Sequence, residues 1–398
     1  MTEKEVGFVS LSKGTGVSDA SWTEIGVGML GYGFMGKAHT NAYKKAPYIF
    51  WPPTAKARLV SICGGRPEGV REAAQRYGYE RSTSDWHDLV TDPNVQLLDN
   101  CGPNYMHAEP CIEAAKAGKH VLCEKPLARS AGEARRMWDA VREAGVKHLC
   151  SFNYRFVPAI RLAKDMIDAG EIGEVYHFRA RYLQEWIMDR EFPWVWRLSK
   201  DVSGSGALGD LGAHVFDLGR FLVGEPASLS AMTETFIKQR TKQETGEAAS
   251  VDVDDAFEAI VRFENGAIGT VEASRFAGGN KNGMTFEING SKRSLRFNLE
   301  RLNELEICEV QQGQGQGFRT VSVTESNHPY MHGWWAHGHN LGWEHAHIHT
   351  IHHMLEAVVK DTEVAPYGAT FEDGYKCAVV CDAVLASSAS GERVLIQY

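Results

Sequence analysis

The chain has 398 residues, of which 43% are hydrophobic and 23% are charged, and its formal net charge is −9. This composition is ordinary for a folded protein and excludes a largely disordered chain. The acidic balance argues against a protein that coats nucleic acid or binds a negatively charged membrane surface. No run of about 18 apolar residues occurs, so the sequence predicts no membrane-spanning helix. The opening residues have early acidic side chains and no long apolar stretch, so we do not expect a secretory signal.

Eight cysteines are scattered through the expected strands and helices. Cys377 and Cys381 are four residues apart, a spacing that suits one face of a helix better than a CxxC site. We therefore expect reduced, mostly buried thiols, which are typical of a cytoplasmic protein.

Strands and helices alternate through the first part of the chain, after a polar extension over residues 1–22. Short apolar runs predict strands at 25–30, 57–63, 94–101, 119–123 and 146–152. Amphipathic segments between them predict helices at 37–46, 68–78, 107–118 and 130–145. This α/β alternation predicts a doubly wound parallel sheet, a dinucleotide-binding Rossmann domain over residues 23–152.

The second part of the chain has a different pattern. Strands are expected at 175–184, 228–238, 256–263, 267–274, 284–288, 294–297, 305–310 and 318–323, and helices at 212–223, 344–359 and 373–388. Asn265-Gly266 separates two of these strands and is a strong hairpin indicator, while residues 311–317 form a low-complexity loop tip. We predict an α+β domain over residues 153–398, built on an open antiparallel sheet, for substrate binding and oligomerisation.

A glycine fingerprint follows the first strand and opens the first helix. Gly31 permits the tight turn, Gly33 allows the backbone to approach a pyrophosphate, and Gly36 allows close packing of helix on strand. The helix N-terminus then offers N–H donors and partial positive charge to the phosphates. The less favoured interpretation is a structural turn that binds no nucleotide.

The end of the second strand usually carries an acidic residue that holds the adenine ribose. Here the sequence has Gly64, Gly65 and Arg66 instead. The guanidinium of Arg66 could pair with a 2′-phosphate, which favours NADP weakly. An Arg66 that is merely solvated, with NAD as the cofactor, is almost as well supported.

Two further segments contain chemically useful side chains. Glu124-Lys125-Pro126 follows the fourth strand and therefore lies at the carboxyl edge of the sheet, where ligands bind. Asp210 and His214 are four residues apart and share a face if that segment is helical. A base, an orienting carboxylate and an ammonium beside a nicotinamide would suffice to oxidise an alcohol. Taken alone, a surface lysine and an ordinary helix pair explain the same residues.

The order and spacing of these motifs resemble the Gfo/Idh/MocA family of sugar and polyol oxidoreductases. The resemblance runs from about Glu24 to the C-terminus. Besides the motifs above, it includes GPNYMH at 102–107, FNYR at 152–155, GALGDLGAH at 206–214 and FEDGY at 371–375. The combination of the EKP and D-x-x-x-H elements is specific. The resemblance implies a Rossmann domain followed by an open antiparallel sheet, in agreement with the pattern above.

The resemblance also implies roles for individual residues. Lys125 is expected to be catalytic, His214 to accept the proton, and Asp210 to bind or orient the substrate hydroxyl. Cofactor contacts are implied for Gly31, Gly33, Phe34, Met35, Gly36, Gly64, Arg66, Pro103, Asn104, His107, Glu124, Lys125, Asn153 and Arg197. Substrate contacts are implied for Lys125, Tyr154, Gln184, Trp186, Arg197, Asp210 and His214.

The aromatic segments 182–186 and 193–197 most resemble family members that act on pyranose-type sugars, the levoglucosan dehydrogenases among them. Flat aromatic faces suit sugar C–H groups, and polar tips suit hydroxyls. Core or subunit packing is the competing interpretation of this stretch.

Nine of the sixteen histidines fall between His328 and His353. His345, His349 and His353 share one helix face, a spacing that could bind a transition metal. HExxH is absent, however, and the resemblance implies no metal, so we expect none. His337 and His339 lie in a Gly/Trp-rich loop that could cover the site.

The sequence therefore predicts an NAD- or NADP-dependent dehydrogenase acting on a secondary hydroxyl of a sugar, anhydrosugar or polyol. One alternative is an NAD-dependent glycoside hydrolase that works by transient oxidation and elimination. A less favoured alternative is an inactive nucleotide-sensing regulator. The expected partner is a small sugar or polyol, with neither nucleic acid nor membrane, and a homo-oligomer, a dimer or tetramer, follows from the family resemblance.

Overall fold

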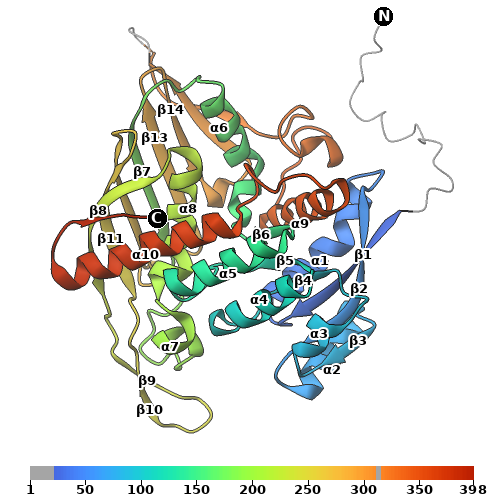
Figure 1. Cartoon of the computed structure of the whole chain (residues 1–398). Helices are drawn as coiled ribbons and strands as arrows, with labels where there is room; N and C mark the ends of the chain where they lie inside the picture. Colours follow the sequence, from blue (N-terminus) through green and yellow to red (C-terminus); the bar gives the residue numbers. More distant parts are fainter. Residues whose placement is uncertain (1–21, 311–314) are drawn as a thin grey trace, which may run out of the picture.

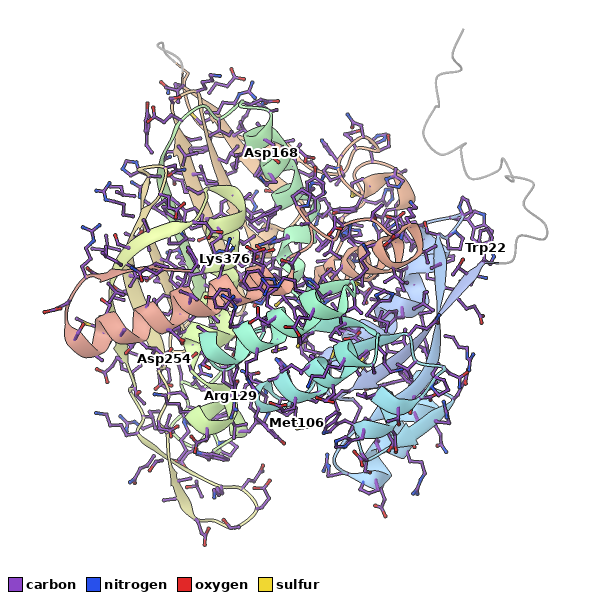
Figure 2. All side chains as sticks on the ribbon, in the orientation of Figure 1. Trp22, Met106, Arg129, Asp168, Asp254 and Lys376 are labelled. Carbon is purple, nitrogen blue, oxygen red and sulfur yellow. The ribbon has the colours of Figure 1, made fainter. Side chains whose placement is uncertain are left out.

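A computed structural model describes residues 22–310 and 315–398, and two sheets dominate its architecture (Figure 1). The expected N-terminal extension falls outside this range except for Trp22, and so does most of the expected loop tip at 311–317. Trp22 packs edge-on against Trp51, with 5.3 Å between the ring centroids, beside the first strand (Figure 2).

In the described part of the chain, six strands form the first sheet in the order β3-β2-β1-β4-β5-β6, and every neighbouring pair is parallel. The strands are β1 (Thr23–Leu30), β2 (Ala55–Cys63), β3 (Arg81–Thr83), β4 (Leu97–Asn100), β5 (His120–Cys123) and β6 (His148–Cys150). The helices between them are α1 (Phe34–Ile49), α2 (Pro67–Tyr77), α3 (His87–Thr91), α4 (Ala108–Lys116) and α5 (Ala131–Ala144). The predicted Rossmann sheet is confirmed. The sequence did not indicate β3 and α3, because both are short and polar.

The strand order reverses at β1, which lies between β2 and β4. Loops that leave the carboxyl ends of parallel strands on either side of such a reversal diverge and leave a crevice. Gly31 follows β1 and Glu124 follows β5, so the topology brings the glycine fingerprint and the EKP segment to the same edge.

Nine strands form the second sheet among the residues that the structure describes, in the order β16-β15-β14-β13-β7-β12-β11-β8-β17. They are β7 (Val175–Leu183), β8 (Pro226–Glu234), β11 (Ala256–Phe263), β12 (Ile268–Ser274), β13 (Gly283–Gly290), β14 (Arg293–Asn298), β15 (Glu304–Glu309), β16 (Arg319–Ser322) and β17 (Val394–Leu395). β9 (Gln239–Thr241) and β10 (Ala248–Ser250) form a separate ribbon that projects from the body (Figure 1).

The second sheet departs from the expected antiparallel arrangement at one pair, because β7 and β12 run parallel. β7 lies between β12 and β13, and the β11–β12 hairpin brings β12 alongside in the same direction. Alternate side chains of β7, such as Phe178 and Ala180, are buried, while Arg179 and Arg181 face outward and are exposed. This alternation gives the sheet one packed face and one largely polar face.

Helices from the second half of the chain pack on both sheets. They are α6 (Pro158–Asp168), α7 (Lys200–Ser203), α8 (Ala213–Leu222), α9 (Trp343–Lys360) and α10 (Phe371–Ser390). α9 packs against α1, and α10 packs against α5, α8 and β8 (Figure 1). Within the two described ranges, no helix combines the length and apolar character needed to cross a membrane.

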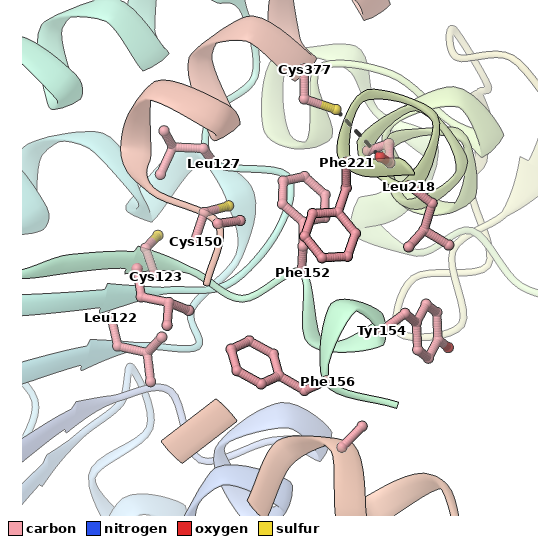
Figure 3. Close-up of a cluster of buried hydrophobic side chains, with 14 of the residues drawn as sticks. Leu122, Cys123, Leu127, Cys150, Phe152, Tyr154, Phe156, Leu218, Phe221 and Cys377 are labelled. Carbon is pink, nitrogen blue, oxygen red and sulfur yellow. Dashed lines mark hydrogen bonds between the residues drawn. The ribbon is translucent and has the colours of Figure 1, made fainter. Parts of the chain in front are cut away.

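A cluster of buried side chains joins the two halves (Figure 3). It brings Leu122 and Cys150 of the first sheet together with Phe152, with Phe221 of α8 and with Cys377 of α10. The thiol of Cys377 donates to the carbonyl of Ala213 at 3.3 Å. All eight cysteines are described and free, as expected. This core fixes α8, which carries His214, relative to the carboxyl edge of the first sheet.

Candidate active site

A cleft of about 1120 Å³ lies at the carboxyl edge of the first sheet and is closed on its other side by residues of the second half. Most of the residues proposed from the sequence line it. They are Gly31, Gly33, Phe34, Met35, Gly64, Arg66, Pro103, Asn104, Glu124, Lys125, Asn153, Tyr154, Gln184, Trp186, Arg197, Asp210 and His214.

The glycine fingerprint has the geometry that a dinucleotide requires. Gly31 has a φ of +98°, and a Cβ there would lie 2.5 Å from the carbonyl oxygen of Cys101. A Cβ on Gly33 would meet no described atom within 4 Å, which leaves open space at the N-terminus of α1. The first turn of α1 carries no acidic side chain, so its N–H donors and partial charge remain available to phosphate.

Gly36 and His107 lie outside the cleft lining, unlike the cofactor contacts that the resemblance implies. A Cβ on Gly36 would lie 2.1 Å from the carbonyl oxygen of Gly31, so this glycine permits helix packing. The ring nitrogens of His107 lie 2.9 Å from the carbonyl oxygen of Pro126 and 3.0 Å from that of Gly102. His107 therefore ties the loop after β4 to the loop after β5.

The ribose end of the cleft is built around Tyr32. A Cβ on Gly64 would lie 2.2 Å from the Tyr32 ring, so only glycine fits beneath it. A hydrogen bond that the exposed Arg66 guanidinium donates to the Tyr32 side chain raises the pKa of Arg66. The Arg66 guanidinium therefore already has a hydrogen-bond partner in the Tyr32 phenol. Ser84 and Trp86 also line this end of the cleft.

Lys125 and Asp210 meet across the cleft. The Lys125 ammonium donates to the Asp210 backbone carbonyl at 2.9 Å and to its carboxylate at 3.2 Å. Burial raises the pKa of Asp210, but Lys125, followed by two arginines, brings it down to about 2. Asp210 lies in a π-helical turn, η5 (Leu208–Gly212), rather than in the α-helical turn expected from its spacing. π-turns within helices are often found at functional sites.

His214 is the second residue of α8 and is buried among aromatic rings. Its ring centroid lies 4.5 Å from that of Tyr154 and 5.9 Å from that of Tyr182. Burial, and then the positive charge of Lys125, lower the pKa of His214 well below 6.5. The imidazole is therefore neutral at neutral pH and able to accept a proton.

Polar and aromatic groups alternate at the far end of the cleft. The hydroxyls of Tyr154 and Tyr182 are 2.8 Å apart, and Tyr182 donates to Asn282 at 2.7 Å. Gln184 also donates to Asn282, at 2.8 Å. Trp186 lines the cleft while packing on a small apolar cluster, so both interpretations of this aromatic stretch apply to it. The Arg197 guanidinium lies over the Trp196 ring at 4.3 Å.

The sequence analysis missed several cleft residues, including Arg275 and Asn282. Arg275 has no exposed surface, and its guanidinium donates to the backbone carbonyl of Asp254 at 3.0 Å. The Gly/Trp-rich loop contributes differently from expectation. His337 and His339 are exposed and do not line the cleft, whereas Trp343, just beyond them, stacks on Phe34 at 5.2 Å.

His347 of α9 also reaches the cleft. Its Nε2 accepts from Asn153 at 3.1 Å, and burial lowers its pKa to about 3. His347 belongs to the histidine-rich segment, but its spacing gave no indication that it, rather than a neighbour, faces the ligand.

Within the described ranges, two groups of side chains have atoms close enough together to hold a metal, and both include His39. The His39 ring nitrogens already face carboxylates: Nδ1 lies 3.0 Å from Asp99, and Nε2 lies 3.0 Å from Glu124. A ring that donates to two carboxylates has no lone pair left for an ion. The donor set thus fits a proton-bridged chain better than a metal.

Comparison with known proteins agrees with this geometry. Residues 25–153 match the model of the oxidoreductase family with an NAD-binding Rossmann fold. Residues 160–296 match the GFO/IDH/MocA C-terminal domain. The chain belongs to the Gfo/Idh/MocA oxidoreductase family. This family membership confirms the resemblance predicted from the motifs, and with it the fold class and the assignment as an oxidoreductase.

Individual family members extend the match over the chain. Levoglucosan dehydrogenase of Pseudarthrobacter phenanthrenivorans is 43% identical over 92% of this chain and 96% of its own. Inositol 2-dehydrogenase of Rhizobium meliloti is 27% identical over 93% of this chain and 98% of its own. The structure of levoglucosan dehydrogenase with NADH and levoglucosan superposes with a TM-score of 0.90 at 42% identity, covering 94% of this chain and all of that one.

Proposed function

We propose that the protein oxidises a secondary hydroxyl of a sugar or anhydrosugar, with NAD as the acceptor. The observation that carries this proposal is the convergence of Lys125, Asp210 and His214 in a cleft that begins at the glycine fingerprint. These are the groups that alcohol oxidation needs: a base, an ammonium to stabilise the oxygen, and a carboxylate to hold the ammonium.

The residues fit a dinucleotide along one side of the cleft. Gly31 and Gly33 with the N-terminus of α1 would hold the pyrophosphate, and Asn153 and Glu124 lie toward the reacting end. When bound, the nicotinamide supplies a hydride acceptor for the carbinol carbon.

The chain's own residues handle the oxygen and its proton. Neutral His214 accepts the hydroxyl proton as the carbon is oxidised to a carbonyl. The Lys125 ammonium donates to the substrate oxygen as negative charge develops on it, which lowers the barrier. Asp210 holds that ammonium in place through two oxygens. Catalysis rests largely on this positioning.

The far end of the cleft suits a carbohydrate. Trp186 and Trp196 offer flat apolar faces, and Tyr154, Gln184 and Asn282 offer donors and acceptors for hydroxyls. The solved relative that binds levoglucosan supports an anhydrosugar or pyranose as substrate. We infer NAD rather than NADP, because Arg66 is engaged by Tyr32 and the solved levoglucosan dehydrogenase carries NADH.

The test is a substrate panel with NAD and NADP, followed by the absorbance of the reduced nicotinamide. Levoglucosan, glucosides, free pyranoses and inositols form the panel. We expect absorbance to grow in proportion to sugar consumed, with levoglucosan among the best substrates. Release of an aglycone without net NADH would instead favour the glycoside-cleaving alternative, and no turnover with any of these compounds would refute the proposal.

We also infer a cytoplasmic homo-oligomer, a dimer or tetramer. The free cysteines, six of them buried, support the location. The outer face of the second sheet supports assembly, since Met232 of β8 and Ile260 of β11 are 73% and 67% exposed on it. Light scattering after gel filtration gives the mass, and Ile260→Glu should reduce it to that of one chain.

A further inference from the structure

A buried chain of charged side chains lies behind Lys125, and the mechanism above does not use it. His39 of α1 lies between Asp99 of β4 and Glu124, which follows β5. Its Nδ1 is 3.0 Å from each carboxylate oxygen of Asp99, and its Nε2 is 3.0 Å from Oε1 of Glu124. The exposed fractions of the three residues are 1%, 0% and 4%.

His39 can satisfy both neighbours only as an imidazolium. A carboxylate accepts hydrogen bonds, so each ring nitrogen must carry a proton to bond one. The polar groups around the ring come from several elements; besides the two carboxylates they are Tyr79, Cys101, Ser151 and His347. Tyr43 lies beside Asp99. Burial lowers the pKa of His39, but the charges and hydrogen bonds of Asp99 and Cys101 together more than offset this effect, and the pKa rises well above 6.5.

Glu124 connects this chain to the reacting lysine. Its second oxygen, Oε2, accepts the backbone N–H of Lys125 at 3.1 Å. The backbone N–H of Glu124 donates to the carbonyl of Asn100 at 2.8 Å, which fixes the segment to β4. The orientation of the Glu124 carboxylate therefore determines where the Lys125 backbone lies.

We propose that His39 is a positioning residue for the oxidation, which acts as an imidazolium that locks Glu124 and, through it, the backbone of Lys125. The inference rests on the proposed function, because it assigns His39 an effect on a catalytic lysine. Loss of the ring frees the Glu124 carboxylate, which lines the cleft and is attracted by the charge of the Lys125 ammonium. The ammonium then shifts from the substrate oxygen, and a shift of about 1 Å can cost ~100-fold in rate.

The protonation state can be tested on the intact protein. Imidazole ¹⁵N spectra of the labelled wild type are recorded about two units above the ordinary histidine pKa of ~6.5. We expect one histidine that still has both nitrogens protonated. The other histidines whose pKa is shifted are all shifted downward, so none should give this pattern. A spectrum with only neutral rings would overturn the proposal, and this test needs no variant.

The kinetic test compares His39→Asn with His148→Asn. His148 is a partly buried histidine of the same sheet, and its Nδ1 accepts from the backbone of Phe371 at 3.0 Å. Both variants should lose some stability. Only His39→Asn should lose about 100-fold in kcat while its Kd for NADH stays at the wild-type value. An unchanged kcat in His39→Asn, or an equal loss in both variants, contradicts a positioning role.

Glu124→Gln provides a second variant that keeps the side-chain shape. Glu124 accepts hydrogen bonds on both oxygens, whereas an amide accepts on one end and donates on the other. As long as His39 remains an imidazolium beside Asp99, one of the two contacts must therefore break, and kcat should fall as in His39→Asn. If the wild type oxidises no sugar at all, the proposed function fails while the imidazolium spectrum still stands. If sugar oxidation is normal in both variants, only the inference about His39 fails.

Discussion

The Lys125 ammonium is held by two oxygens of a single residue, the carbonyl of Asp210 at 2.9 Å and its carboxylate at 3.2 Å. Lys125 follows a strand of the first sheet, and Asp210 lies in the turn before α8, so these bonds link the two halves of the molecule across the cleft. An ammonium has three N–H donors. With two directed at Asp210, the third remains for a substrate oxygen.

Replacement of Lys125 by Met should therefore abolish most of the turnover without preventing nucleotide binding. The variant removes the donor to the developing negative charge, a change that typically costs about 10²–10³ in kcat. NADH affinity should be nearly unchanged, because the glycine fingerprint and the α1 N-terminus are untouched. Steady-state rates and a fluorescence titration with NADH measure the two effects, and a kcat close to wild type would dismiss the role of Lys125.

His214→Asn should remove the proton acceptor and lower kcat by about 10²–10⁴. In the wild type, the base must be neutral to act, and burial with Lys125 lowers its pKa well below 6.5. The acid limb of kcat/KM should thus lie below the ordinary histidine range, and activity should persist as the pH falls through 6.5. A pH–rate profile measures the limb; a midpoint at or above 6.5 would contradict this assignment.

Much of the fold follows from local patterns, and the exceptions have physical reasons. The alternation of apolar strands with amphipathic helices was enough to predict the first sheet. β3 was not predicted, because it is a three-residue polar strand at the sheet edge. α6 was not predicted either. It has Pro158 in its first turn, where proline often starts a helix, but no side chain caps its N-terminus. The parallel pairing of β7 with β12 depends on contacts about 90 residues apart in the chain, which periodicity cannot specify.

The site was predictable where a motif indicated both the functional residue and the edge of the sheet on which it lies, as for Lys125 and Gly33. The buried chain through His39 was not, because its members come from α1, β4 and the end of β5. One indication did exist: Asp99 directly follows Leu97 and Leu98 in β4, and it is fully buried. A buried carboxylate needs a charged or hydrogen-bonding partner, although the sequence alone does not say which.

Two of the fingerprint glycines, Gly33 and Gly36, should respond differently to alanine. Gly33→Ala adds a Cβ into open space, so the melting temperature should stay near wild type while the methyl group obstructs the pyrophosphate and weakens NADH binding. Gly36→Ala places a Cβ 2.1 Å from a backbone carbonyl, so stability itself should fall. Thermal unfolding and NADH titration of both variants separate the effects. Unchanged NADH affinity in Gly33→Ala would argue against nucleotide binding at this turn.

Acid should destabilise the protein through its buried neutral histidines before its carboxylates protonate. Burial lowers the pKa values of His347 and His349 to about 3. Between about pH 6.5 and 4.5, the unfolded chain takes up protons on these residues and the folded chain does not. The free energy of unfolding should therefore fall by about 1.4 kcal/mol per pH unit for each group.

His39 does not add to this loss, because its raised pKa keeps its contribution complete below 6.5. Urea unfolding at about pH 7.5, 5.5 and 4.5 measures the trend, and His349→Gln is the comparison. That variant should be less stable at neutral pH, since it loses bonds to Trp334 and to the carbonyl of Phe156, but its stability should fall less steeply in acid. Equal slopes in the two proteins would show that His349 takes up its proton equally in the folded and unfolded states.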